Sequence, residues 1–245
     1  MTIFISHRGE SCDAPENTLS AFKLAAKRHT DGIECDIYFT SDKQVVCCHD
    51  ENALRTSGHD ALIPQTLFET LRSWDFCNRK KAYLGERIPT LAETLACLKG
   101  DMQIYIEIKL GNVEMVPAML KIIDESDVKQ EQVTMICFGQ DVCIECKRLR
   151  PSLKTLWLAA YSDENPITAK GLIAELRKCK ADGVDLAGVF KFVDKKFVSA
   201  VKAAGFYFAV WTIDDAARAR ELIDAGVDSI TSNRAAAVMS ELRKK

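Results

Sequence analysis

The stretch Gly32–Cys48 reads GIECDIYF, TSDKQ and VVCC, which is two apolar runs joined by a short polar link. Apolar runs of this kind, Gly32–Phe39 and Val45–Cys48, are typical of buried strands. A crossover between parallel strands needs about a dozen residues or more, and the link Thr40–Gln44 is far shorter. We therefore expect the second run to pair antiparallel with the first, as a hairpin outside the regular order of the sheet.

The rest of the chain alternates between strand patterns and helix patterns. Further strand candidates share the same apolar, β-branched composition; they are Thr2–Ser6, Gln103–Ile108, Val133–Cys137, Thr155–Leu158, Gly183–Leu186, Phe206–Trp211 and Ser229–Thr231. Amphipathic stretches between them predict helices; they include Thr18–Lys27, Val116–Ser126, Ile167–Lys178, Lys195–Ala204 and Ala216–Ala225. We expect Asp214 to cap the last of these and Gly226 to end it.

Without the hairpin strand, eight parallel strands remain, each followed by room for a helix. This pattern predicts an α/β fold, a (β/α)8 TIM barrel, and an open doubly wound sheet is the alternative. The segment of about residues 50–88 interrupts the pattern, and only Leu67–Trp74 looks helical within it. Excursions of this length are usually lids or binding loops. We expect a short insertion after the hairpin strand, placed over one end of the barrel, in a single domain spanning residues 1–245.

Composition limits the class of protein. The 245 residues are 47% hydrophobic, enough for one large core, and a formal net charge of −2 gives no basic surface for nucleic acid. No apolar run reaches about 18 residues, and the N-terminus does not look like a signal peptide. The ten scattered cysteines then favour reduced thiols, and the pair Cys143 and Cys146 favours helix packing over zinc or redox chemistry. We expect a cytoplasmic protein without stable membrane anchoring; a homo-oligomer stays open.

Charged side chains interrupt two of the predicted strands. Glu34 and Asp36 are two residues apart and share a face, and so do Glu107 and Lys109. A buried charge is costly unless it is paired or bound to a metal. An ion pair with Lys109 or Arg8 would account for one carboxylate, but three converging carboxylates need a cation. An all-oxygen set suits a hard ion, Mg²⁺ or Ca²⁺.

Two histidines also end strands. His7 ends the first strand and His49 the hairpin strand, whereas His29 and His59 lie elsewhere and are expected to be structural. Active sites of TIM barrels lie at the C-terminal ends of the strands. We therefore expect His7 and His49 beside the carboxylates. Trp211 ends the eighth strand candidate and is either part of the core or a platform for the non-reacting half of a ligand.

The motifs follow one another along the chain; they are His7-Arg8-Gly9, Pro15-Glu16-Asn17-Thr18, Glu34-x-Asp36, His49-Asp50, Glu107-x-Lys109 and Trp211-Thr212. This ordered combination resembles the glycerophosphodiester phosphodiesterase family of PLC-like phosphodiesterase barrels. The resemblance implies metal-dependent hydrolysis of glycerophosphodiesters, such as glycerophosphocholine, to glycerol 3-phosphate and an alcohol. It also implies roles for site residues: Glu34, Asp36 and Glu107 as metal ligands, His7 and His49 as the acid–base pair, and Arg8, Lys109 and Trp211 as phosphate or substrate contacts.

Other functions stay open at this point. A lysophospholipase D of the same architecture would need an apolar groove, to which Trp74, Phe76 and Tyr83 of the insertion are candidates to contribute. A non-catalytic phosphate- or metal-binding barrel would have lost key side chains that this chain retains. The nucleophile is either water or a neighbouring glycerol hydroxyl.

Two stretches depart from the family pattern. Thr231-Ser232-Asn233-Arg234 stands where the family commonly has Thr-Asp-x-Pro, and Cys137-Phe138 stands where it often has Ser-Phe. We expect both departures to affect the shape of the pocket and the capping of the last helix. We do not expect either to touch the metal ligands or the histidines.

Overall fold

The computed structural model describes residues 1–243 and places nine strands in one sheet, in the order β1-β9-β8-β7-β6-β5-β4-β2-β3. The strands are β1 (Ile3–Ser6), β2 (Gly32–Phe39), β3 (Val45–Cys47), β4 (Gln103–Ile108), β5 (Val133–Cys137), β6 (Lys154–Ala159), β7 (Gly183–Ala187), β8 (Tyr207–Trp211) and β9 (Ser229–Ser232). β1 pairs in parallel with both β2 and β9, which closes eight parallel strands into a barrel. The predicted (β/α)8 TIM barrel is confirmed, and the sheet is not open.

The hairpin strand behaves as its short link requires. β3 pairs antiparallel with β2, with Phe39 opposite Val45 and Ile37 opposite Cys47. The link is folded tightly, because the hydroxyl of Thr40 contacts Asp42 at 2.7 Å and accepts from the backbone N–H of Gln44 at 3.0 Å. β3 therefore lies outside the barrel and extends only the β2 side of the sheet.

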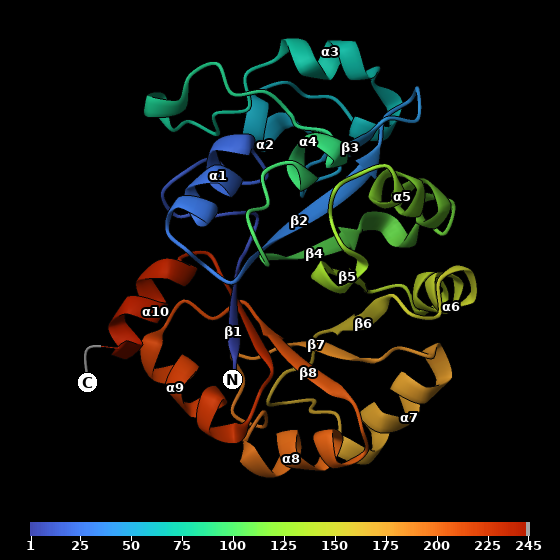
Figure 1. Cartoon of the computed structure of the whole chain (residues 1–245), viewed down its shortest axis with the longest axis vertical. Helices are drawn as coiled ribbons and strands as arrows, with labels where there is room; N and C mark the ends of the chain where they lie inside the picture. The colour runs from blue at the N-terminus through green and yellow to red at the C-terminus, as the bar shows by residue number, and fades with distance from the viewer. Residues whose placement is uncertain (244–245) are drawn as a thin grey trace.

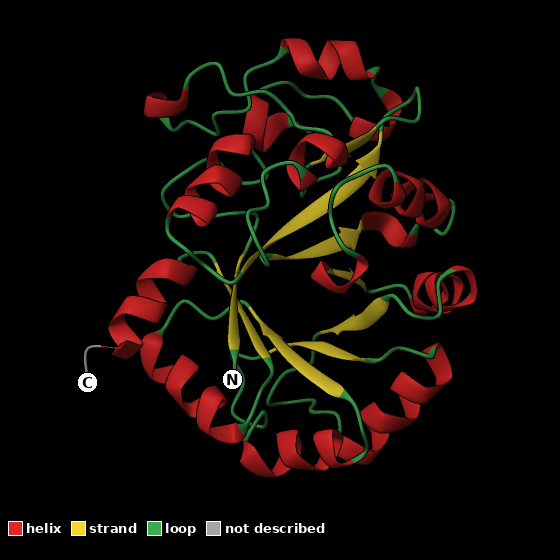
Figure 2. Ribbon diagram, viewed as in Figure 1, coloured by secondary structure: helices red, strands yellow, loops and turns green. Residues whose placement is uncertain are grey.

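The helices surround the barrel, as Figures 1 and 2 show. Those that follow the parallel strands are α1 (Leu19–Lys27), α4 (Leu91–Leu95), α5 (Met115–Asp124), α6 (Gln140–Leu149), α7 (Ala169–Cys179), α8 (Lys195–Ala203), α9 (Ala216–Ala225) and α10 (Ala235–Arg243). The expected N-cap of α9 was wrong by one residue. Asp215 caps it by accepting from the backbone N–H of Arg218 at 2.7 Å, since an N-cap side chain reaches the third helical residue. Gly226 ends the helix with a φ of 95°, as expected.

The insertion packs against the hairpin at the C-terminal end of β2, and its Arg55 and Lys80 donate to the loop that follows β1, at the same end of the barrel. It contains α2 (Leu54–Ser57), η1 (Ile63–Gln65), α3 (Phe68–Ser73) and η2 (Lys81–Tyr83), and in Figure 1 it lies at the top, next to β3. Its buried side chains form one cluster with the face of the hairpin that continues the inner face of β2: Tyr38, Val46, Cys48, Ala53, Ile63, Leu71, Phe76 and Ile88. The opposite face of the hairpin, with Ile37 and Val45, packs in the layer of the helices. The insertion therefore covers the apolar inner face where the hairpin extends past the barrel.

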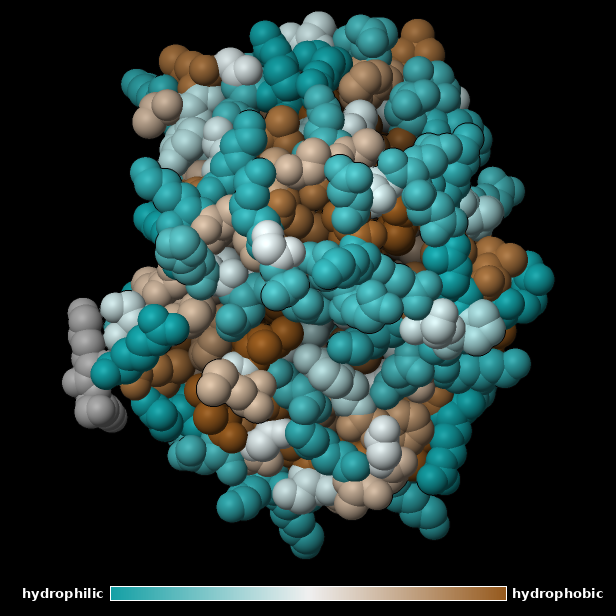
Figure 3. Space-filling view, viewed as in Figure 1, coloured by the Kyte–Doolittle hydropathy of each residue, from teal (hydrophilic) through white to brown (hydrophobic). Residues whose placement is uncertain are grey.

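Two apolar layers hold the barrel. Its interior is filled by Ile5, Tyr105, Ile136, Leu156, Leu158 and Ala209, and a larger layer lies between the strands and the helices. Cys143 and Cys146 are fully buried in the outer layer, as helix packing requires, and all ten cysteines are free. The face in Figure 3 is mostly hydrophilic, with hydrophobic side chains in separate patches. No helix within residues 1–243 is both long enough and apolar enough to cross a membrane.

Candidate active site

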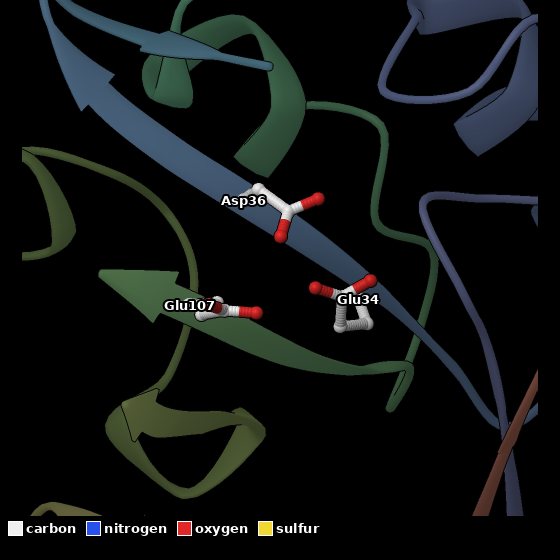
Figure 4. Close-up of side chains that lie close together, drawn as sticks. All are labelled: Glu34, Asp36 and Glu107. Carbon is white, nitrogen blue, oxygen red and sulfur yellow. The ribbon is translucent and has the colours of Figure 1, made fainter. Parts of the chain in front are cut away.

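Three carboxylates meet at one end of the barrel. Asp36 on β2 is paired in register with Glu107 on β4, and Glu34 lies on the same face of β2. Figure 4 shows the three side chains turned toward one another from the two strands. Each offers an oxygen within 4.8 Å of the others. The side chains of Glu34 and Asp36 are 3% and 1% exposed, and that of Glu107 is 12% exposed, so little solvent screens their repulsion.

Two cationic side chains neutralise part of the negative charge of this cluster. Lys109 Nζ lies 2.9 Å from Glu107 and 3.4 Å from Asp36, and Arg8 Nε lies 3.3 Å from Asp36. Burial alone would raise the pKa of Asp36, but Arg8 and Lys109 outweigh it and lower that pKa. Burial and the charge of Asp36 raise the pKa of Glu34 well above its usual value and that of Glu107 to about 7. The two positive charges of Arg8 and Lys109 therefore do not balance three ionised carboxylates.

The cluster fits a hard divalent cation. Oxygens that share one Mg²⁺ or Ca²⁺ lie about 2.0–2.6 Å from it, hence no more than about 5 Å from one another. The three carboxylates meet this limit, and Oδ1 of Asp36 is buried without a hydrogen-bond partner among residues 1–243. An added cation would satisfy this oxygen and supply the missing positive charge.

The loop after β1 fixes Asp36 from the other side. Asn17 donates from Nδ2 to Oδ2 of Asp36 at 2.8 Å, and its Oδ1 accepts from the backbone N–H of Asp36 at 3.2 Å. The backbone N–H of Arg8 donates to Glu34 at 2.9 Å, and the guanidinium of Arg8 donates to Glu16 at 3.0 Å. Arg8 and Asn17 both have positive φ values, 56° and 53°, which brings these groups close to the carboxylates.

His7 is held by a neutral partner. Its Nδ1 lies 2.7 Å from Oδ1 of Asn233, and Nδ2 of Asn233 donates to Asp214 at 2.7 Å. A carbonyl oxygen only accepts, so Nδ1 of His7 carries the proton. Burial, and then the charge of Arg8, lowers the pKa of His7 to about 4. His7 is therefore neutral at pH 7, and its Nε2, 3.9 Å from Glu34, keeps a free lone pair.

His49 has a charged partner instead. Its Nδ1 lies 2.7 Å from Oδ1 of Asp50, and Arg55 Nε donates to the other oxygen of Asp50 at 2.6 Å. The hydrogen bond from Arg55 lowers the pKa of Asp50 to about 2, so Asp50 is a carboxylate at neutral pH. The hydroxyl of Tyr38 also donates to the backbone oxygen of His49 at 3.2 Å. The two histidines thus differ in the partner of Nδ1, which is a neutral amide for His7 and a carboxylate for His49.

Both histidines open into one cavity of about 210 Å³ at this end of the barrel. Its lining consists of His7, Arg8, Glu34, His49, Glu107, Lys109, Ile136, Phe138, Leu158, Asp185, Trp211 and Thr231. The structure therefore brings together the candidate residues of the sequence, and Asp36, which is not in the lining, has an oxygen within 4.8 Å of those of Glu34 and Glu107. Among the described residues, none from 50–88 lines this cavity, and neither do His29 and His59.

The aromatic residues of the insertion serve its own packing. Phe76 is buried in the cluster beneath the insertion, and Trp74 stacks on His59 with ring centroids 4.2 Å apart. They do not extend the active-site cavity. On the cavity side, Trp211 donates from Nε1 to the backbone oxygen of Asp185 at 3.0 Å and meets the edge of Phe138.

Comparison with known proteins decides the family. The model of the glycerophosphoryl diester phosphodiesterase family matches residues 7–237. The chain belongs to this family. It is accordingly a phosphoric diester hydrolase, as the motifs implied. It is 29% identical to a glycerophosphodiester phosphodiesterase of Caldanaerobacter subterraneus subsp. tengcongensis over 99% of this chain and 98% of that one. A second such enzyme, from Bacillus subtilis, is 25% identical over 94% of this chain and 82% of that one.

A solved structure extends the comparison. The fold matches a phosphodiesterase of Oleispira antarctica in complex with the product sn-glycerol-3-phosphate, with a TM-score of 0.86 and 26% identity. The match covers all of this chain and 98% of the other. The family assignment and the barrel thus rest on independent comparisons of sequence and structure.

One departure from the family pattern reaches the site after all. We expected Ser232-Asn233-Arg234 to leave the histidines untouched, and this was wrong, because Asn233 bonds directly to His7. The backbone brings the two together: β1 and β9 are neighbours, and His7 donates from its backbone N–H to Ser232 at 2.8 Å. The other departure is also close, since Phe138 lines the cavity.

Sequence reasoning missed other residues of the site. Asn17 belongs to a motif that was recognised but given no role. Asp185 interrupts the apolar run of β7, which is the same signal that identified Glu34 and Glu107, and it was overlooked. Thr231 and Asn233 belong to a stretch that was recognised as a departure from the family pattern but were given no role, because a threonine and an asparagine at a strand end are common without function.

Proposed function

We propose that this chain hydrolyses glycerophosphodiesters to glycerol 3-phosphate and an alcohol, with a divalent cation and with His7 and His49 as the acid–base pair. The observation that carries the proposal is that both histidines open into the same cavity as Glu34 and Glu107. The product bound to the Oleispira antarctica relative supports the substrate class. Family membership supports the reaction class.

We assign Glu34, Asp36 and Glu107 as the ligands of Mg²⁺ or Ca²⁺. Such an ion, when bound, neutralises charge on a phosphate oxygen as it grows in the transition state. Arg8 and Lys109 line the cavity beside these carboxylates and place further positive charge next to the phosphate. A phosphodiester monoanion repels nucleophiles, so neutralising its charge lowers the barrier to attack.

The partners of the two histidines support different roles. His7 is neutral and its Nδ1 is committed to Asn233, so its Nε2 accepts the proton of the attacking hydroxyl group. The carboxylate of Asp50 stabilises a positively charged His49, as the aspartate of a catalytic triad does for its histidine. His49 then donates a proton to the departing alkoxide. These roles of His7 as base and His49 as acid are the same whether the nucleophile is water or an internal glycerol hydroxyl.

The size of the cavity favours a small, water-soluble substrate. Pockets for drug-sized ligands usually measure about 300–1,000 Å³, whereas this one measures about 210 Å³. An acyl chain gains about 0.8 kcal/mol for each buried CH₂, and Trp74, Phe76 and Tyr83 of the insertion are not in the cavity lining to supply such burial. We therefore place lysophospholipids second as substrates. We also propose a reducing compartment, the cytoplasm, because all ten cysteines are free.

The experiment that tests the function is a panel of diesters assayed for release of glycerol 3-phosphate. Glycerophosphocholine, glycerophosphoethanolamine and glycerophosphoglycerol are compared with lysophosphatidylcholine, each with Mg²⁺, with Ca²⁺ and with excess chelator. We expect metal-dependent release from the water-soluble diesters at a higher kcat/KM than any product from the lysophospholipid. Release of choline with lysophosphatidic acid at the higher kcat/KM would move the chain to the lysophospholipase D function. Turnover of no member would overturn the proposal.

A further inference from the structure

The floor of the cavity holds two polar side chains that the proposed mechanism does not use. Asp185 projects from β7 and Thr231 from β9, and both line the cavity. They are 1% and 2% exposed. Within residues 1–243, Oδ1 of Asp185 and Oγ1 of Thr231 find no hydrogen-bond partner.

Such atoms are unusual in a folded protein. The large majority of buried polar side-chain atoms have a hydrogen-bond partner, and one without a partner costs folding free energy. Two in the lining of one active-site cavity therefore call for a common explanation. A ligand group that both donates and accepts hydrogen bonds would satisfy them.

The position of Asp185 separates it from the charged half of the site. In the barrel order, β7 lies four strands from β2 in either direction, so Asp185 faces the carboxylate strand across the interior. It forms no ion pair with Arg8 or Lys109, which line the same cavity and pair with Glu16, Asp36 and Glu107. Its strand neighbours in register are Leu158 and Ala209, both apolar.

We propose that Asp185 and Thr231 form a hydroxyl-binding subsite that recognises the free hydroxyl groups of the glycerol moiety. The inference rests on the proposed function, since it places the phosphate of the same substrate between the cation ligands, Arg8 and Lys109. With the phosphate there, the glycerol carbons extend across the interior toward Asp185, which lies beside Leu158 and Trp211. Thr231 lies on β9, midway between β2 and β7 in the barrel order, and lines the same cavity.

The chemistry of the pair favours hydroxyl groups over the other parts of a diester. Arg8 and Lys109 attract the phosphate anion to their side of the cavity, and Asp185 offers no positive charge that would compete with them. An ammonium head group would need a carboxylate, whereas burial, and then the charge of Glu107, raises the pKa of Asp185 to about 8. At neutral pH Asp185 is therefore mainly an uncharged carboxyl group, which donates and accepts hydrogen bonds. The hydroxyl of Thr231 does the same.

Binding of two ligands to the metal-loaded protein tests the subsite without requiring turnover. Glycerol 3-phosphate and n-propyl phosphate share the phosphate and the three-carbon chain and differ by two hydroxyl groups. Isothermal titration calorimetry gives the ratio of their dissociation constants. For the unaltered chain we expect glycerol 3-phosphate to bind about 10-fold tighter or more, as one or two hydrogen bonds provide.

The variants separate recognition from packing. Asp185→Ala and Thr231→Val should each reduce the preference about 5- to 10-fold, with n-propyl phosphate affinity within about 2-fold of its original value. Asp185→Asn retains a donor and an acceptor and should keep most of the preference. Thr134→Val is the matched control, because Oγ1 of Thr134 is also buried without a partner but does not line the cavity.

The outcomes distinguish this inference from the proposed function. Equal affinity for the two ligands, or an unchanged preference in both Asp185→Ala and Thr231→Val, would overturn the subsite even if glycerophosphodiesters are hydrolysed. A preference lost equally in Thr134→Val would also overturn it, as a general effect of packing. A preference that depends on Asp185 and Thr231, in a chain that hydrolyses no glycerophosphodiester, would support the subsite and overturn the proposed reaction.

Discussion

Oδ1 of Asn233 lies 2.7 Å from Nδ1 of His7, and the amide nitrogen of the same side chain donates to Asp214 at 2.7 Å. The second bond determines the first. Because Asp214 accepts from the amide nitrogen, the carbonyl oxygen of Asn233 must face His7. His7 therefore keeps its proton on Nδ1 and presents a bare Nε2 to the cavity. A residue of the stretch that departs from the family pattern thus sets the tautomer of a candidate catalytic base.

The first prediction removes this partner. Asn233→Ala leaves His7 free to change its tautomer and orientation, and we expect kcat to fall about 10- to 100-fold, the range found when partners of functional histidines are removed. Ser11→Ala is the control, because Ser11 also donates to Oδ1 of Asn233, at 3.2 Å, but leaves the bond to His7 intact. Glycerol 3-phosphate release measures both. An unchanged kcat in Asn233→Ala would show that the amide has no part in positioning His7.

The second prediction separates the two kinds of histidine. His7→Ala and His49→Ala should each lower kcat about 10²- to 10⁴-fold, the usual contribution of a positioned acid or base. His29→Ala and His59→Ala should remain within a few-fold, since neither residue lines the cavity. Steady-state kinetics of the four purified variants provide the measurement. A loss in His59→Ala as large as that in His49→Ala would contradict the assignment.

The sequence predicted the barrel because strand and helix periods are local. Bounds such as Gly32–Phe39 and Gln103–Ile108 match the strands residue by residue, since apolar runs reflect burial on both faces. The hairpin followed from the length of one link. The packing of the insertion on one face of the hairpin did not, because no local pattern tells which face of the sheet lacks cover.

The site was predictable only where a residue type is unusual in its setting. Glu34, Asp36 and Glu107 were identified because a charged residue is unusual within an apolar strand. The same criterion would have identified Asp185. Asn233 was beyond reach, because its role arises from contact with His7, 226 residues earlier in the chain. Asp214 was taken for a helix cap, whereas its carboxylate accepts from Ser232 and Asn233. Contacts between the ends of distant strands depend on the closed barrel and leave no local signature.

The third prediction concerns the cation. Exhaustive chelation should abolish turnover, and Mg²⁺, Mn²⁺ or Ca²⁺ should restore it, because three carboxylates exceed the charge of Arg8 and Lys109. Glu107→Gln removes one charged ligand and should raise the metal concentration for half-maximal activity at least about 10-fold. Glu114→Gln is the control, since the side chain of Glu114 is 80% exposed and forms an ion pair with Lys43 on the surface. Full activity after chelation and dialysis would refute the role of the cluster.

The fourth prediction concerns stability and pH. Burial, and then the charge of Glu107, raises the pKa of Asp185 from 3.8 to about 8. Between these values the folded chain holds a proton that the unfolded chain releases, so the free energy of unfolding decreases as pH rises. Asp185→Asn carries no charge and escapes this loss. With chelator present, its Tm should exceed that of the unaltered chain by an amount that grows between about pH 5 and pH 8, where each 1 kcal/mol corresponds to about 2–4 °C.

Calorimetric scans at a series of pH values measure this difference. Thr231→Val is the control, because it removes an unpartnered polar atom without a charge and should shift Tm equally at every pH. A constant Tm difference between Asp185→Asn and the unaltered chain would mean that Asp185 titrates normally.

The last prediction concerns Trp211. Its ring lies in the wall of the cavity, fixed by the bond from Nε1 to Asp185 and by the edge contact with Phe138, whose ring centroid is 5.9 Å away. We expect a ring in this position to touch the non-reacting part of a substrate equally in the ground state and the transition state. We therefore expect Trp211→Ala to raise KM about 5- to 10-fold and to lower kcat less than about 3-fold, as loss of uniform binding does.

Trp74→Ala should change neither value, because Trp74 stacks on His59 in the insertion. A fall in kcat larger than the rise in KM would instead place Trp211 among the groups that act on the transition state, through the backbone of Asp185 that it holds.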